Sequence, residues 1–138
     1  MSSVRKKDQS EHRFTVLDKV LDLYEHSTTV TANKMFEKFP SLGDRINNEA
    51  SMIYHYCRLA NEELDARKQD EAQMRIELQE KAIDLCKWLK TDIRLAQRKF
   101  HFRARKAIYW NNLVNVAMDA IKGWNRSEVK RYKETFGL

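Results

Sequence analysis

The chain has 138 residues with one Pro and three Gly, and its 26 Lys and Arg outnumber its 20 Asp and Glu to give a formal net charge of +6. This length fits one domain, and the scarcity of Pro and Gly predicts an all-α protein and argues against a β-rich fold. No window approaches the roughly 20 consecutive apolar residues of a membrane span, so no membrane segment is expected. The basic excess favours anionic partners, with nucleic acid first and acidic protein surfaces or lipid second.

The N-terminal region combines a polar tail with a predicted helix. Residues 1–11 have no apolar period and no signal-peptide core, so a disordered tail is expected. From residue 12 to Phe39, apolar residues recur every three or four positions, which predicts a helix. Residues 27–31 are weak helix formers, so a bend or a close helix crossing is expected there. Pro40 is expected to end this helix, and Ser41 to cap the next one.

The second predicted helix carries two apolar rows. One row runs from Leu42 to Leu64 at helical spacing. The other row lies beside it and consists of Met52, Tyr56 and Leu59. A single core-facing stripe cannot hide both rows, so the second row is predicted to contact another subunit.

The third predicted helix follows a polar turn at residues 65–71 and becomes strongly basic. Residues 85–110 hold eight Lys and Arg against one acid, Asp92, and this net charge of +7 exceeds that of the whole chain. The basic residues are Lys87, Lys90, Arg94, Arg98, Lys99, Arg103, Arg105 and Lys106. The first four are spaced three or four apart and form one row along the helix, which predicts contacts with the phosphates of a nucleic acid.

The fourth predicted helix follows a turn at residues 100–102 and again has two apolar rows. The core row ends at Trp124, and Gly123 is expected to stop the helix. The second row is predicted to lie in a contact between subunits and consists of Tyr109, Leu113 and Val116. Residues 125–138 are basic and are expected to form a C-terminal tail, either as a short helix or as a loose segment.

Four helices with short connections predict an up-down-up-down four-helix bundle over residues 12–124, with flexible basic termini. In that topology the first and third connections share one end, which adds Lys34, Lys38 and Arg45 to the basic residues. Residues 62–84 hold eight acids against four bases and lie toward the other end. The bundle is therefore expected to be polarised, with its positive end at the third connection.

Motifs for catalysis or metal binding are not evident. The four His residues, at positions 12, 26, 55 and 101, are scattered, and none lies four residues from another His or a Cys, as a helical metal site requires. The chain has no Gly-rich phosphate loop and no Ser–His–Asp candidate set. We therefore expect a protein that is not an enzyme and that has no metal or cofactor. Cys57 and Cys86 are expected to be buried thiols in a reducing cytoplasm, with a disulfide as the alternative.

The basic stretch at residues 85–110 has a plain interpretation as a solvated face. Against that interpretation, acids are almost absent from it and aromatic residues alternate with the cations. These aromatic residues are Trp88, Phe100, Phe102, Tyr109 and Trp110. Aromatic rings beside cations suit single-stranded or folded RNA, because bases stack while phosphates are neutralised. The leading hypothesis is RNA or DNA binding, and the alternative is an oligomeric scaffold whose basic end docks an acidic protein.

Short motifs give the chain a resemblance to a known family. LGDRI at residues 42–46 is similar to the opening of the second helix in the accessory variability determinants of diversity-generating retroelements, which are four-helix bundles related to proteins encoded in 23S ribosomal RNA intervening sequences. The basic third helix, the aromatic turn after it and IKGW at residues 121–124 are similar in kind and order. Two features depart from the family: the tight turn at residues 39–41 and the basic residues after position 124.

The resemblance implies a barrel-like homopentamer that binds a reverse transcriptase and nucleic acid. Such a protein assists template-primed complementary DNA synthesis without catalysing it. The residues by themselves predict less than this: a basic, non-catalytic helical bundle that associates with further copies of itself.

Overall fold

The computed structural model describes the backbone of residues 2–137 and the side chains of residues 15–137. Its elements are α1 (Ser2–Thr31), the 3₁₀-helix η1 (Lys34–Lys38), α2 (Pro40–Arg58), the π-helix η2 (Leu59–Glu63), α3 (Gln69–Phe100) and α4 (Ala104–Phe136). The all-α prediction is confirmed, with four long helices and no strand in the described part of the chain. The backbone of residues 2–11, for which a tail was predicted, lies in α1, so the first helix begins before the predicted start at residue 12. None of the described helices is long and apolar enough to cross a membrane.

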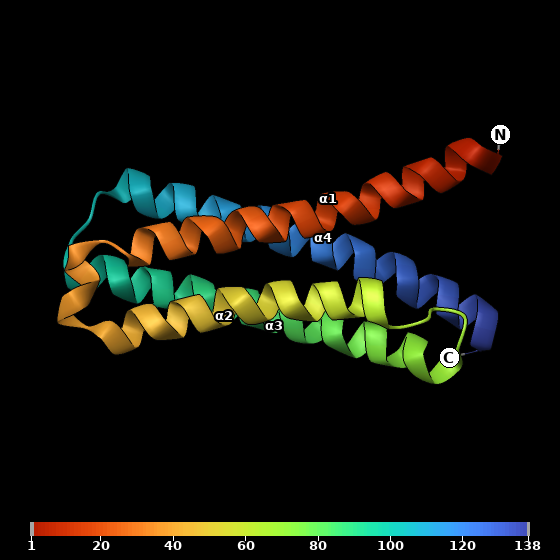
Figure 1. The fold of residues 1–138 in the computed structure, drawn as a ribbon. Coiled ribbons are helices and arrows are strands. Elements are labelled where there is room, and N and C mark those ends of the chain that lie inside the picture. The colour runs from red at the N-terminus through yellow and green to blue at the C-terminus, as the bar shows by residue number, and fades with distance from the viewer. Residues whose placement is uncertain (1, 138) are drawn as a thin grey trace.

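The four long helices lie side by side (Figure 1). Each of α1 and α3 packs on both α2 and α4. Figure 1 places η1 and the α3–α4 connection at one end of the molecule and η2 at the other. Ring contacts join the elements at the first end, because the centroid of Phe100 lies 4.8 Å from that of Phe36 and 5.8 Å from that of Phe39. The basic α3–α4 connection therefore lies directly beside η1.

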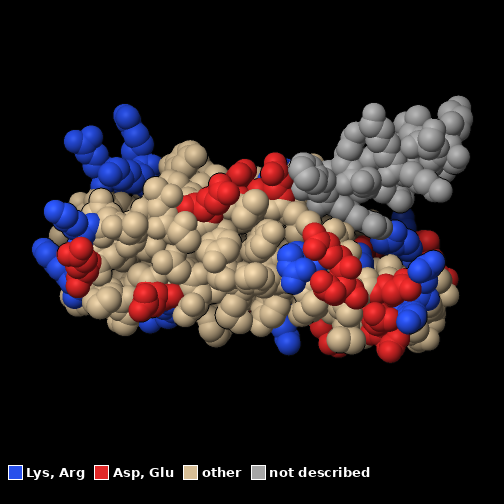
Figure 2. Space-filling model, in the orientation of Figure 1, with Lys and Arg blue, Asp and Glu red and all other residues tan. Residues whose placement is uncertain are grey.

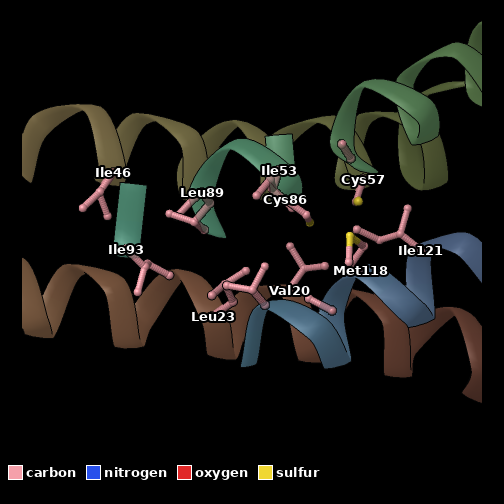
Figure 3. Close-up of a cluster of buried hydrophobic side chains, with 14 of the residues drawn as sticks. Val20, Leu23, Ile46, Ile53, Cys57, Cys86, Leu89, Ile93, Met118 and Ile121 are labelled. Carbon is pink, nitrogen blue, oxygen red and sulfur yellow. The ribbon is translucent and has the colours of Figure 1, made fainter. Parts of the chain in front are cut away.

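All four helices contribute side chains to one hydrophobic core (Figure 3). The labelled members are Val20 and Leu23 from α1, Ile46, Ile53 and Cys57 from α2, Cys86, Leu89 and Ile93 from α3, and Met118 and Ile121 from α4. Burying one large apolar side chain of this kind stabilises the fold by roughly 1.5–3 kcal/mol. Both cysteines are buried and free, which confirms the prediction of buried thiols.

The first connection differs from the sequence prediction. The predicted helix from residue 12 to Phe39 is wrong, because α1 ends at Thr31 and η1 follows as a separate turn. The side chain of Asn33 caps η1 by accepting a hydrogen bond of 3.0 Å from the backbone N–H of Met35. Pro40 does not end a helix but begins α2, where its missing N–H leaves no hydrogen bond unmade. The N-cap of α2 is consequently Phe39 and not Ser41.

The end of α4 also differs from the prediction. Gly123 does not stop the helix, and residues 125–136 continue α4 to Phe136, so no boundary exists at residue 124. Glu128 and Tyr132 in this extension are almost fully buried. Glu128 accepts hydrogen bonds from Arg75 of α3, which lies 53 positions earlier in the chain. This long-range pair anchors the basic C-terminal residues to the bundle.

Candidate nucleic-acid interface

The eight predicted phosphate-binding residues lie on the last turns of α3, in the α3–α4 connection and on the first turn of α4. Seven of them are exposed, and Lys90 is half-buried. Figure 2 shows Lys and Arg side chains projecting from the end of the molecule that carries η1 and the start of α4. Lys34 and Lys38 of η1 are also exposed at this end. We refer below to the eight predicted residues as the basic cluster.

Most of the basic cluster has no acidic partner. Lys87 lies 3.9 Å from Asp84, and the other seven residues have no carboxylate oxygen within 4.0 Å among the described side chains. The one acid in the stretch, Asp92, instead accepts hydrogen bonds of 3.0 and 2.8 Å from Arg45 of α2. Arg45 is therefore neutralised, and its predicted addition to the free positive charge is wrong. The same pairing keeps Asp92 from neutralising the lysines and arginines of α3.

The α3 part of the basic cluster borders a shallow groove. Lys87, Lys90 and Arg94 line it together with Thr91 and with Met118 of α4. The groove has a volume of about 230 Å³. Cations repeated along a groove match the regular spacing of phosphates on a nucleic-acid backbone.

The aromatic residues of the basic stretch divide into structural and exposed groups. Phe100, the last residue of α3, packs against Phe36 of η1, and Trp110 is buried, so neither ring is free to stack on a base. Trp88 and Tyr109, by contrast, are 66% and 56% exposed. Phe102 is half-buried against the core. The predicted alternation of aromatic and basic residues therefore leaves two rings available at the surface.

Arg105 and Lys106 lie apart from the α3 row, beside a cavity between α1 and α4. The cavity has a volume of about 430 Å³. Its apolar walls are formed by Val30, Met35, Phe102, Tyr109 and Trp110. The indole N–H of Trp110 donates a hydrogen bond of 3.0 Å to the hydroxyl of Ser27, which fixes this ring in place.

The two predicted subunit-contact rows are only partly exposed. The first row, called the α2 row here, has Met52 and Tyr56 on α2 and Leu59 at the start of η2. Met52 is 41% exposed and Leu59 is exposed, whereas Tyr56 is half-buried. In the α4 row, Tyr109 and Val116 are exposed, whereas Leu113 packs against the core. Trp88 of α3 joins the α2 row, because it lines the same shallow groove as Met52 and Tyr56. We refer to Met52, Tyr56, Leu59 and Trp88 as the α2–α3 apolar face.

Beside the α2–α3 apolar face lies a pair of carboxyl groups that the sequence did not predict. Glu49 is 5% exposed, and its side chain and that of Asp92 are joined by a hydrogen bond. Burial raises the pKa of Glu49 to about 8, and the hydrogen bond and negative charge of Asp92 add to this effect. One carboxyl oxygen of Glu49 has no hydrogen-bond partner. The sequence signal for this pair was the position of Glu49, which lies four residues after Arg45 and beside the apolar residues Ile46 and Ala50.

The chain matches no protein-family model, no curated protein and no solved structure. The assignment of the candidate interface therefore rests on the geometry and charge of this chain alone. No group of three or more His, Cys, Asp or Glu side chains in the described part of the chain is placed to hold a metal ion.

Proposed function

We propose that this protein is a non-catalytic accessory subunit that binds single-stranded or folded nucleic acid through the basic cluster. The observation that carries the proposal is that seven of the eight cations in the cluster have no acidic partner among the side chains that the structure describes. Like charges without partners repel one another, which destabilises the isolated protein. Phosphates bound beside these cations remove the repulsion, and the counterions released from the nucleic acid favour binding further.

The resemblance to accessory variability determinants supplies the biological setting of the proposal. In that setting an up-down-up-down bundle assists the reverse transcriptase of a diversity-generating retroelement in the cytoplasm. The motif residues Leu42, Ile46, Ile121 and Trp124 are all buried. The burial of these motif residues supports a mode of packing shared with that family. The reverse transcriptase partner is inferred from the resemblance.

We predict that Arg94→Glu combined with Arg98→Glu abolishes binding of RNA and DNA. Both side chains are exposed, and substitutions of this kind usually change the free energy of unfolding by less than ~0.5 kcal/mol. Reversing two charges in the row both removes phosphate contacts and adds repulsion. Electrophoretic mobility shift and fluorescence anisotropy would measure the affinity, and circular dichroism would measure the melting temperature.

The matched control is Lys130→Glu combined with Lys133→Glu, which makes the same change in net charge near the end of α4. Both lysines are exposed. The control should retain most of the affinity, because its charges lie far from the basic cluster. Equal losses in the two variants would show that binding follows only the net charge, and the assigned site would be wrong. A large drop in melting temperature for Arg94→Glu/Arg98→Glu would assign the row a structural role.

The second candidate function is that of a protein-binding oligomeric scaffold without nucleic acid. The α2–α3 apolar face favours it, because an exposed Trp among other apolar side chains marks a contact surface. Salt separates the two functions: log affinity for nucleic acid should fall with log salt by roughly 0.7–0.9 per phosphate neutralised. Absence of any RNA or DNA binding at low salt would favour the scaffold.

Both functions include self-association, and we predict a mass several times the 16.5 kDa of one chain. The α2 and α4 rows are different surfaces, so a contact between them is head-to-tail, and such contacts form a ring when the rotation between subunits closes. Five subunits come from the family resemblance. Analytical ultracentrifugation at micromolar concentration would measure the mass, with Met52→Glu as the variant that weakens assembly. A monomer would exclude the ring, and a dimer would exclude the head-to-tail geometry.

A further inference from the structure

The cavity between α1 and α4 has one fixed aromatic wall and one open aromatic face. Trp110 is fixed by its hydrogen bond to Ser27. The rings of Tyr109 and His26 meet edge to face, with centroids 5.0 Å apart and an interplanar angle of 71°. In this arrangement His26 covers at most one face of Tyr109, and Tyr109 is 56% exposed. An aromatic face of this kind can stack on a flat ring that enters from solvent.

The cavity also presents polar groups that its own side chains leave unused. The carbonyl oxygen of the Asn33 side chain accepts the hydrogen bond from Met35, and its NH₂ group remains as a donor. Burial lowers the pKa of His26, so its ring is neutral at pH 7 and one ring nitrogen is an acceptor. A donor and an acceptor on an otherwise apolar lining select a planar ligand with both kinds of group at its edge.

The charges beside the cavity are positive and unpaired. Arg105 and Lys106 line it, both are exposed, and neither lies within 4.0 Å of a carboxylate in the described part of the chain. The volume of about 430 Å³ lies within the range of small-ligand sites, which is roughly 300–1,000 Å³. The lining therefore suits a flat heteroaromatic ring that carries negative charge just outside the cavity.

We propose that this cavity binds one unpaired base of a single-stranded nucleic acid, stacked on Tyr109, with the flanking phosphates on Arg105 and Lys106. The proposal rests on the proposed function, because the basic cluster supplies the rest of the contact with the strand. A base within a duplex cannot enter, since its faces are covered by its neighbours and its edge is paired. The cavity thus adds a preference for single strands to a cluster that recognises phosphates.

The experiment measures the binding of two strands of equal length by the full chain. One strand is fully abasic, and the other is identical except for a single 2-aminopurine. Wild-type protein should bind the strand with the base about tenfold more tightly, which corresponds to one stacked base, and should quench its fluorescence. Tyr109→Ala should remove this difference in affinity between the two strands. Tyr109→Phe should retain the difference, because the ring is kept.

The outcomes separate the cavity from the basic cluster. If wild-type protein binds neither strand, the proposed function itself fails and the cavity proposal falls with it. If both strands bind equally, the proposed function stands and the cavity does not take a base. If Tyr109→Ala lowers the oligomeric mass and keeps the tenfold difference, the cavity is a contact between copies and the proposal is overturned. A duplex carrying the same base should show no dependence on Tyr109.

Discussion

Replacing Arg75 by Met is expected to lower the free energy of unfolding by about 3–5 kcal/mol, because the buried carboxylate of Glu128 loses its closest ionic partner. The remaining cation, Arg131, is partly exposed and lies 3.4 Å away. The two side chains are 3% and 1% exposed and are joined by hydrogen bonds of 3.0 and 2.5 Å. Arg75 also donates to the backbone carbonyls of Ala60 and Leu64, which ties η2 to α3. Urea denaturation followed by circular dichroism would measure the loss.

The pH dependence of this loss follows from the pKa of Glu128. Burial alone would raise that pKa, but the hydrogen bonds from Arg75 and Tyr132 outweigh burial and hold it below its ordinary value. In the wild type the pair therefore stabilises the fold above the unfolded-state pKa, and this stability is lost as the pH falls through the lower folded-state pKa. In the Arg75→Met variant, burial favours the protonated form of the Glu128 carboxyl group, because the cation that stabilised its charge is gone. The difference in stability between wild type and variant should accordingly shrink as the pH falls.

Two further variants give the Arg75 prediction its controls. Arg67→Met removes a guanidinium that is 91% exposed and paired with Asp65, and the melting temperature should barely change. Arg75→Met combined with Glu128→Gln removes both charges and keeps hydrogen-bonding atoms for Tyr132 and Trp124, so it should recover much of the loss. Additive losses in the double variant would contradict the account of an unpaired buried charge.

Replacing Glu49 by Gln is expected to remove a pH-dependent loss of stability of a few kcal/mol at alkaline pH. The folded-state pKa of Glu49 is raised to about 8, so the fold favours the protonated carboxyl. That stability is fully present below the unfolded-state pKa and is lost as the pH rises through about 8. Gln resembles the protonated carboxyl in shape and can still donate a hydrogen bond to Asp92.

Melting temperatures at about pH 5, pH 7 and pH 9 would test the Glu49 prediction. Glu49→Gln should match the wild type at the lowest pH and exceed it at the highest. The matched control is Glu62→Gln, an exposed acid near the end of the same helical segment, which should show no such crossover. A variant that melts below the wild type at pH 9 would show that the carboxylate form of Glu49 is the stabilising one.

The candidate site was partly accessible to sequence reasoning. The charge row of Lys87, Lys90, Arg94 and Arg98 follows from helical spacing, and its exposure follows from the apolar row beside it. The cavity of Tyr109 and Trp110 was not accessible, because its walls come from α1, η1 and α4. The spacing of residues along one helix does not report which side chain of another helix stands opposite.

The sequence by itself determined the all-α class, the number of long helices and the concentration of positive charge, because each of these depends on composition and on periods within one segment. The tertiary structure alone decided which charges are free. Asp92 finds Arg45 and not the cations of its own helix, and Glu128 finds Arg75 across 53 positions. Both pairs are selected by packing, since a carboxylate that packing removes from water is stable only where a cation is already held opposite it.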